Sequence, residues 1–334
     1  MNIAIFGAGS IGCYLGGQLA QTGVNVTFIG RKRFKSAIEK NGLTLTHFER
    51  DAIKLSPDKF TFSLEPKDIA SADIILLTTK SQDTAEAAKS LKAHAKDEAI
   101  IISFQNGVSN AELLRKNIPQ TVLGAVVPFN VTGTGPGRFH CGTEGDLTVQ
   151  KIEDTRLEGL QSLFAKTGQD LVLSDNILGV QWGKLLVNLN NAFNTLTGGT
   201  LREGLLQRDY RRGLALVVEE GLRVAQGAGI APAAFGKADA AKMIKILRLP
   251  NFIYKIIMNR IVKIDAAARS SMLDDLELGR VSEIDYLQGE IVRLAEATGQ
   301  TAPYNKIIYN MVGEAFAKGQ SPKFTGREIY SRLK

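Results

Sequence analysis

Short apolar runs alternate with amphipathic segments through the first 130 residues. The runs are rich in β-branched side chains, which is typical of strands buried on both faces of a parallel sheet. Strands are predicted over 3–6, 26–29, 72–79, 99–104 and 121–129, and helices over 10–22, 34–41, 85–94 and 109–117. This alternation predicts a doubly wound parallel sheet with helices on its faces.

Two segments interrupt this alternation. Residues 43–62 alternate apolar and polar side chains, which predicts short strands or a hairpin. Residues 133–149 are rich in glycine and predict a hairpin whose turn is Gly135-Pro136-Gly137.

The pattern changes after about residue 176, where strand signals end and long helical periods begin. Helices are predicted over 177–196, 210–227, 283–298 and 305–318, and an apolar and basic stretch covers 235–264. The chain is therefore predicted to consist of an α/β domain, residues 1–175, and an all-helical domain, residues 176–334.

Composition narrows the class of protein. The chain has 334 residues, for which two domains are expected, and 44% of them are hydrophobic, enough for a sizeable core. Its net charge of +7 comes from dispersed basic residues, so we expect no nucleic-acid partner, and the positive balance suits an anionic cofactor and substrate.

The sequence does not predict a metal site, a disulfide framework or a membrane-spanning segment. Cys13 and Cys141 are too few for a disulfide framework, and the three histidines lack ligand spacing, so no metal site is expected. Charged residues interrupt every long apolar stretch, including 251–264, and the chain leads directly into a core strand. These features predict a cytoplasmic protein with no membrane partner.

A glycine turn follows the first predicted strand, in Gly7-Ala8-Gly9-Ser10-Ile11-Gly12. In this GxGxxG pattern Gly7 makes the tight turn, Gly9 lets a pyrophosphate approach the backbone, and Gly12 lets the helix pack on the strand. The following helix points the N–H groups of its first turn, from Ser10 and Ile11 onward, at the phosphates. The strand before the turn and the helix and strand after it predict a dinucleotide site.

Basic and polar residues follow the other predicted strands. Arg31 stands where an acidic residue would hold a ribose 2′-hydroxyl, and its guanidinium suits a 2′-phosphate, which favours NADP(H) over NAD(H). The alternative for Arg31 is an ordinary exposed loop charge. Lys80 and the segment 105–107 also follow strands, so we expect them to face the same crevice as the glycine turn.

The helical half carries two polar motifs. Lys184, Asn188 and Asn191 are spaced i, i+4, i+7, which places them on one face of a helix. Asparagine is a weak helix former, and a polar ligand could supply partners for these amides. Bonds between helices are an equally good explanation for Asn190 and Asn194. In the second motif, Ser282 can cap a helix beginning at Glu283, and this alone would explain an acidic residue there.

Together these motifs resemble the 2-dehydropantoate 2-reductase (ketopantoate reductase) family over nearly the whole chain. The resemblance rests on GAGSIG at 7–12, Arg31, Lys80 after ILLTTK, QNG at 105–107, W-x-KLLVN at 182–188 and SSMLDDLELGRVSEIDYLQG at 270–289. It implies a Rossmann-type domain followed by a helical domain like the C-terminal domain of 6-phosphogluconate dehydrogenase.

The resemblance also implies roles for individual residues. Lys184 would be the general acid, and Glu283 would orient it and contact the substrate and cofactor. Substrate contacts would come from Asn188, Asn191, Asn106 and Ser271. Cofactor contacts would come from Gly7, Gly9, Ser10, Ile11, Gly12, Arg31, Lys80, Asn106 and Glu283.

The implied activity is the NADPH-dependent reduction of 2-dehydropantoate to (R)-pantoate, in pantothenate and coenzyme A biosynthesis. The segment NLNNAFNTLTG departs from the family pattern, so either Asn191 or Asn194 is the second substrate asparagine. This departure keeps open a related reductase of another 2-keto acid or an opine-type substrate. A non-catalytic NADP(H)-binding protein is the second alternative. The oligomeric state stays open, with a homodimer as one arrangement.

Overall fold

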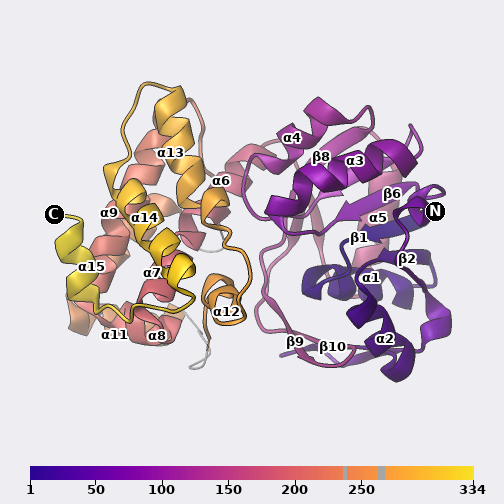
Figure 1. The fold of residues 1–334 in the computed structure, drawn as a ribbon, viewed down its shortest axis with the longest axis horizontal. Helices are drawn as coiled ribbons and strands as arrows, with labels where there is room; N and C mark the ends of the chain where they lie inside the picture. The colour runs from indigo at the N-terminus through magenta and orange to yellow at the C-terminus, as the bar shows by residue number, and fades with distance from the viewer. Residues whose placement is uncertain (236–238, 262–267) are drawn as a thin grey trace. The chain divides into compact units, whose positions relative to one another are not determined.

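The computed structural model describes residues 1–235, 239–261 and 268–334 (Figure 1). The contacts divide the chain into two compact units, Met1–Ile177 and Leu178–Lys334. The predicted boundary after residue 175 concerns domains that fold independently, which contacts alone do not test, so it stays a prediction. Residues 236–238 and 262–267, which belong to the predicted stretch 235–264, lie outside the described residues.

The first unit is built on an eight-stranded sheet. Its strands are β1 (Asn2–Phe6), β2 (Asn25–Ile29), β5 (Thr61–Ser63), β6 (Ile74–Leu77), β7 (Ile100–Ser103), β8 (Thr121–Val126), β11 (Leu147–Gln150) and β12 (Leu171–Ser174). They lie in the order β12-β11-β8-β7-β6-β1-β2-β5, and every neighbouring pair is parallel except β11 and β8. The predicted doubly wound parallel sheet is confirmed from β1 to β8, whereas the sequence interpretation did not include β12.

Helices cover both faces of this sheet (Figure 1). They are α1 (Ser10–Gln21), α2 (Lys32–Asn41), α3 (Thr84–His94), α4 (Asn110–Asn117) and α5 (Thr155–Ala165), with short 3₁₀ turns η1 (Pro57–Lys59), η2 (Pro66–Ile69) and η3 (Ser81–Asp83). Alternate strand residues supply two separate cores, because successive side chains of a strand point to opposite faces. Ile3 and Ile5 pack in the cluster with α1 and α5, and Ala4 and Phe6 pack in the cluster with α3 and α4.

A second, four-stranded sheet packs against α1. Its strands are β3 (Leu43–His47), β4 (Ile53–Leu55), β9 (Val131–Gly135) and β10 (Arg138–Cys141), in the order β4-β3-β10-β9. Two antiparallel pairs, β3 with β4 and β9 with β10, join through a parallel pairing of β3 with β10. The predicted hairpin at Gly135-Pro136-Gly137 is confirmed, but β5 and β11, at the far ends of the two predicted segments, join the main sheet instead.

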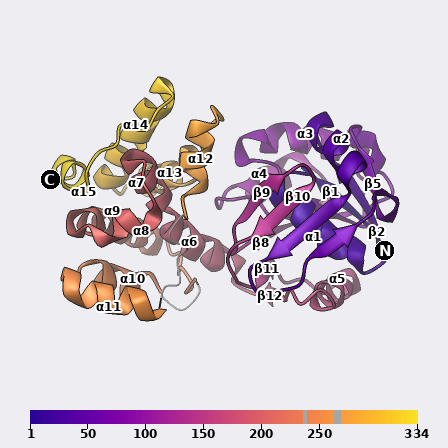
Figure 2. The ribbon, with the colours of Figure 1, turned by 90° about the horizontal axis from the view of Figure 1, so that it is seen from below.

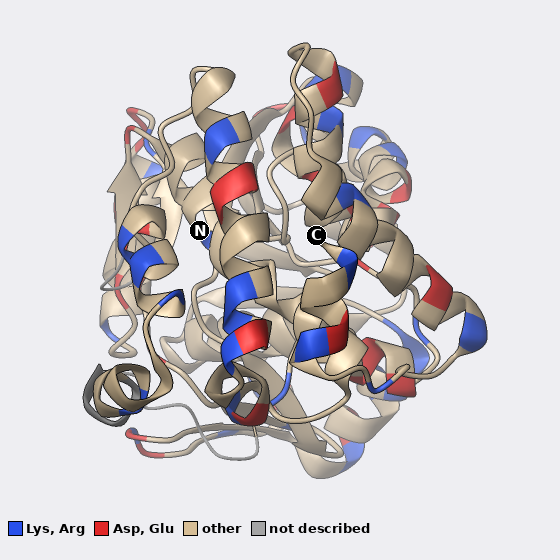
Figure 3. Ribbon diagram, turned by 90° about the vertical axis from the view of Figure 1, so that its left-hand side faces the viewer, with Lys and Arg blue, Asp and Glu red and all other residues tan. Residues whose placement is uncertain are grey.

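The second unit is helical. Its elements are α6 (Ile177–Asn188), α7 (Asn190–Thr197), α8 (Leu201–Leu206), α9 (Arg208–Gly227), α10 (Ala240–Leu247), α11 (Asn251–Ile261), α12 (Ser271–Glu277), η4 (Ile284–Tyr286), α13 (Gln288–Ala297), α14 (Pro303–Lys318) and α15 (Gly326–Arg332). Helix α9 packs against α10, α13, α14 and α15, and Figure 2 shows α10 and α11 side by side. Positive and negative side chains are interspersed along these helices (Figure 3).

Two helix predictions in this unit are wrong in their bounds. The helix predicted over 177–196 breaks at Leu189, within a segment that contains four asparagines, which are weak helix formers. The helix predicted to begin at Glu283 begins at Gln288. Ser282 does accept a bond from a backbone N–H, that of Ile284 at 3.1 Å, but Ile284 is the first residue of the 3₁₀ helix η4, whose N-cap is Glu283.

One fully buried cation ties α10 and α11 to α9. The Arg211 guanidinium donates hydrogen bonds to the carbonyl oxygens of Leu247 and Leu249 and to Asn251 Oδ1, at 2.8–3.3 Å. It also lies 4.0 Å from the centre of the Tyr254 ring. Burial lowers the pKa of Arg211, and these bonds and the ring contact compensate for the lost hydration.

Candidate active site

The glycine turn has the geometry that a dinucleotide requires. Gly7 has φ +109°, and a Cβ there would lie 2.6 Å from the backbone nitrogen of Thr79. A Cβ on Gly12 would lie 2.5 Å from the carbonyl oxygen of Gly7, whereas a Cβ on Gly9 would meet no atom nearer than 3.9 Å. Gly7 and Gly12 are therefore required by the turn and its packing. Gly9 leaves the backbone open to a bulky anion.

Hydrogen bonds hold this turn in place. The N–H groups of Gly7 and Ala8 both donate to the carbonyl of Ile29, at 3.0 and 2.9 Å, and Thr78 Oγ1 donates to the carbonyl of Gly7 at 2.8 Å. Helix α1 begins after Gly9 and has no acidic residue in its first turn. Its N–H groups and the positive end of its dipole can therefore receive a phosphate.

Arg31 and Lys80 follow β2 and β6, the two strands on either side of β1. Arg31 precedes α2, its side chain is 74% exposed, and Nη2 lies 3.9 Å from Asp83 Oδ2. Such an exposed pair is weak, so the guanidinium can exchange the carboxylate for a phosphate. Lys80 is half-buried and precedes η3.

The segment after β7 is fixed by a buried amide that the sequence interpretation gave no role. Gln105 Nε2 donates to Thr84 Oγ1 at 2.8 Å and to the carbonyl of Lys80 at 3.3 Å. The carbonyl of Asn106 accepts Asn110 Nδ2 at 2.6 Å, while the Asn106 residue is half-buried. Gln105 thus joins the segments that follow β6 and β7, and the bonds to the Asn106 carbonyl hold the backbone there.

These residues all follow the carboxyl ends of adjacent parallel strands. The glycine turn follows β1, Arg31 follows β2, Lys80 follows β6, and Gln105 and Asn106 follow β7. In a doubly wound sheet this is the edge at which ligands bind.

In the second unit, Lys184 lies close to Glu283. Helix α6 carries Lys184, and Glu283 stands just before η4 with 6% of its surface exposed. Burial lowers the pKa of Lys184 to about 8, and the neighbouring Glu283 carboxylate acts in the opposite direction. A lysine with a pKa near the working pH can both hold a proton and release it, as a general acid must.

The asparagines after Lys184 fall into two groups. Asn188 and Asn191 are half-buried, but only Asn188 shares α6 with Lys184, because Asn191 lies in α7 beyond the break. The side chains of Asn190 and Asn194 are engaged within the fold. Asn190 Oδ1 accepts a bond from Tyr210 Oη at 2.6 Å.

Asn194 is completely buried and uses both ends of its amide. Its Oδ1 accepts the N–H of Ser270 at 2.9 Å, and its Nδ2 donates to the carbonyl of Gly199 at 2.8 Å. Ser270 in turn caps α12 by accepting the N–H of Leu273 at 3.2 Å, and Ser271 is the first residue of that helix and half-buried. Asn194 therefore positions the α12 terminus that carries Ser271.

Neither a metal centre nor a membrane span is found in the described residues. Across 1–235, 239–261 and 268–334, no three His, Cys, Asp or Glu side chains are grouped so as to hold a metal ion. No helix within those ranges is long and apolar enough to cross a membrane.

Comparison with known proteins gives the family. Two family models match: ketopantoate reductase PanE/ApbA over residues 3–154, and its C-terminal domain over residues 176–315. The 2-dehydropantoate 2-reductase of Pyrococcus horikoshii is 30% identical, over 93% of this chain and 96% of the relative. That of Halobacterium salinarum is 25% identical, over 93% and 98%.

Solved structures agree with these matches. A PanE/ApbA family ketopantoate reductase from Ralstonia eutropha is 31% identical with a TM-score of 0.82, covering 96% of this chain and 99% of that one. A D-mandelate dehydrogenase in ternary complex with NADH and anilino(oxo)acetate has the same fold, at 22% identity and a TM-score of 0.80, covering 96% and 99%. This chain is an oxidoreductase of the ketopantoate reductase PanE/ApbA family.

Proposed function

We propose that this protein reduces 2-dehydropantoate to (R)-pantoate with NADPH, a step toward pantothenate and coenzyme A. The observation that carries the proposal is the pairing of Lys184 with Glu283 in the helical unit, with the pKa of Lys184 lowered to about 8. Relatives named 2-dehydropantoate 2-reductase that match almost end to end support the choice of substrate.

The first unit offers a fitting site for the cofactor. The open backbone at Gly9 and the first turn of α1 suit the pyrophosphate, and Arg31 and Lys80 would hold the 2′-phosphate of NADPH. Asn106 would lie beside the nicotinamide. When bound, NADPH supplies the hydride that reduces the substrate carbonyl.

Residues of the protein would stabilise the negative charge that forms on the substrate during reduction. As the carbonyl carbon gains a hydride, negative charge builds on the carbonyl oxygen. The Lys184 ammonium stabilises this charge and donates the proton that completes the hydroxyl group. Glu283 orients Lys184 and accepts a hydrogen bond from that hydroxyl. Asn188 and Asn191 would hold the substrate, and Ser271 its carboxylate.

An NADPH oxidation assay tests the proposal. Wild-type protein should oxidise NADPH with 2-dehydropantoate, and Lys184→Ala should lose turnover by roughly 10²–10⁴-fold while NADPH still binds. Lys318→Ala, which removes an exposed lysine of the same unit, is the control and should keep full activity. Near-normal kcat in Lys184→Ala would show that another group donates the proton.

A reductase of a different 2-keto acid is the second candidate. The departure at NLNNAFNTLTG and the fold shared with a D-mandelate dehydrogenase favour it. A panel of aliphatic and aryl 2-keto acids, compared by kcat/KM, separates the two. Tight NADPH binding without oxidation by any keto acid would instead indicate a non-catalytic binding protein.

A further inference from the structure

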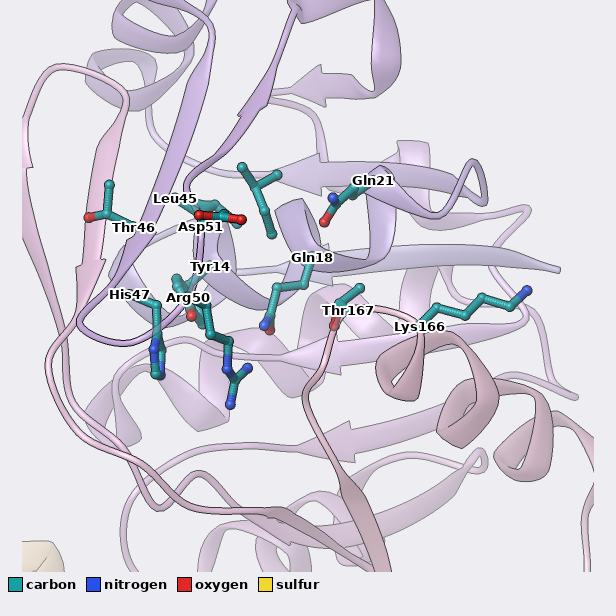
Figure 4. Close-up of a pocket in the computed structure, with 11 residues that line it drawn as sticks. Tyr14, Gln18, Gln21, Leu45, Thr46, His47, Arg50, Asp51, Lys166 and Thr167 are labelled. Carbon is teal, nitrogen blue, oxygen red and sulfur yellow. The ribbon is translucent and has the colours of Figure 1, made fainter.

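A pocket lies in the first unit along the flank of α1, beyond the glycine turn (Figure 4). Helix α1 contributes Tyr14 and Gln18, the end of β3 and the turn after it contribute His47 and Arg50, and the loop after α5 contributes Thr167. Gln18 is about 12 Å along the helix axis from Ser10, at 1.5 Å per residue. We call this the α1 pocket, and none of its residues belongs to the proposed reductase site.

Gln18 brings an unsatisfied amide to the α1 pocket. The residue is 1% exposed, and its Oε1 atom is buried without a hydrogen-bond partner in the described part of the chain. Buried side-chain oxygens nearly always accept a hydrogen bond. Figure 4 shows the amide directed into the pocket, so a bound molecule that donates a hydrogen bond would satisfy it.

Arg50 brings an unsatisfied cation to the same space. Its Nη1 atom is buried and, among the described residues, has no hydrogen-bond partner. The side chain lies against the loop after α5, since a Cβ on Gly168 would be 4.0 Å from Nη1. A guanidinium presents two parallel N–H donors, which match a carboxylate or a phosphate.

Three further polar groups of the pocket, those of Tyr14, His47 and Thr167, are neutral at neutral pH. Burial raises the pKa of Tyr14, so its hydroxyl stays protonated. Burial and Arg50 lower the pKa of His47, and its Nδ1 accepts the N–H of Glu49 at 3.1 Å. The ring proton is then on Nε2, which is a donor. Thr167 Oγ1 donates to the carbonyl of Phe164 at 2.7 Å and can itself accept.

Two charged residues besides Arg50 also line the pocket. Asp51 and Lys166 both line the pocket and are exposed. In Figure 4 Lys166 extends away from Gln18 and Arg50. The pocket therefore brings together the buried Nη1 atom of Arg50 and the buried Oε1 atom of Gln18, both without a partner among the described residues, with neutral hydroxyl and ring groups beside them.

We propose that the α1 pocket binds a small carboxylate that carries a hydroxyl group. The carboxylate pairs with the Arg50 guanidinium, and the hydroxyl donates its hydrogen bond to Gln18 Oε1. The site is distinct from the reductase site and does not depend on the function proposed above.

A titration followed by ¹⁵N–¹H NMR on the intact protein tests this inference, with glycolate, acetate and inorganic phosphate as probes. Glycolate should shift the amide signals of Tyr14, Gln18 and Thr167 and saturate with a Kd below about 10 mM. Acetate, which lacks the hydroxyl, should bind about 3- to 10-fold more weakly. The positions of the shifted amides distinguish this site from any binding near Lys184.

Three variants identify the contacts. Arg50→Met should weaken glycolate binding by about 10-fold or more, and Gln18→Leu should make glycolate and acetate bind alike. Lys166→Met, which removes a cation directed away from the interior, should bind as wild type. Turnover of NADPH should be unchanged in folded Arg50→Met.

Several outcomes would overturn the inference. Absence of shifts at these amides would indicate a pocket filled with water only. Phosphate binding without glycolate binding would refute the ligand class. Unchanged glycolate affinity in folded Arg50→Met, or an undiminished preference for glycolate over acetate in Gln18→Leu, would refute the assigned contacts.

Discussion

At the scale of single residues, identical side chains serve different purposes within one short segment. Asn190 and Asn194 bond to Tyr210, Ser270 and Gly199 and so belong to the framework of the helical unit. The spacing of the asparagines could not separate them from Asn188 and Asn191, because the distinction depends on which elements pack over α7. We therefore assign Asn191, rather than Asn194, as the second proposed substrate ligand.

The pH dependence of turnover should report on Lys184. Its pKa is lowered to about 8, so the protonated donor is present below that pH and is lost as the pH rises through it. Glu283 opposes this lowering, so Glu283→Gln should move the alkaline limb of kcat/KM to lower pH. Profiles of kcat/KM from about pH 6 to about pH 10 in the wild type and in Glu283→Gln measure this shift.

Asp285→Asn is the matched control for this profile. Asp285 is exposed and accepts a hydrogen bond from Tyr309 Oη at 2.6 Å, and its neutralisation should leave the limb in place. A limb that moves to higher pH in Glu283→Gln would contradict the proposed pairing.

Arg31 should decide between the two nicotinamide cofactors. Replacing it with Asp brings a negative charge to the proposed 2′-phosphate position, so NADPH binding should weaken by about 10- to 100-fold and NADH binding far less. Calorimetric titration of both cofactors measures the difference. Lys40→Asp makes the same charge change at the other end of α2 and should have little effect on the binding of either cofactor. Equal losses of NADPH and NADH binding in Arg31→Asp would refute the proposed role of Arg31 at the 2′-phosphate.

At the scale of elements, helix α14 begins on a carboxylate supplied by another helix. Glu220 of α9 accepts the backbone N–H groups of Tyr304 and Asn305 at 3.1 and 2.7 Å and Asn305 Nδ2 at 2.8 Å. These are donors that the first turn of a helix cannot satisfy internally. One buried side chain thus caps α14 and fixes it against α9.

Loss of this charge should destabilise the helical unit. Glu220→Gln should lower the free energy of unfolding by about 1–3 kcal/mol, since charge-assisted bonds are replaced by weaker ones in a buried setting. Urea denaturation followed by circular dichroism measures it. Glu219→Gln removes the adjacent exposed carboxylate, paired with Arg248 at 2.5 Å, and should cost less than about 1 kcal/mol. Equal effects would show that Glu220 has no special role.

Local pattern predicted most elements but not their partners. Strands β1, β6 and β7 could be recognised from their apolar runs, because a strand that is buried on both faces has few polar positions. Strands β5, β11 and β12 have only three or four residues each, and their places in the main sheet depend on pairing with β2, β8 and β11, which no local periodicity encodes. The same reason applies to the two candidate sites. The glycine turn is a local motif and could be predicted from sequence. The α1 pocket could not, because Gln18 and Arg50 become buried only when separate segments of the chain pack together.

At the scale of the whole molecule, the first unit should fold without the second. Its main core includes Leu157, Leu160 and Phe164 of α5 and Leu171 of β12. A fragment of residues 1–177 retains them, so it should unfold cooperatively and bind NADPH. A fragment of residues 1–154 lacks them and should not. Thermal unfolding and cofactor titration measure both; a cooperative 1–154 fragment would show that α5 and β12 are dispensable.

The parallel pairing of β3 with β10 has a consequence for the time course of folding. It joins segments far apart in the chain, as in the bond between Thr46 and His140, which are 94 positions apart. Closing so long a loop costs entropy before any contact repays it, and such pairings form slowly. In the chain, β3 lies between β2 and β5 and β10 lies between β8 and β11, so formation of the main sheet brings the two segments close together. We therefore expect the second sheet to assemble late, packing against α1 after the main sheet has formed.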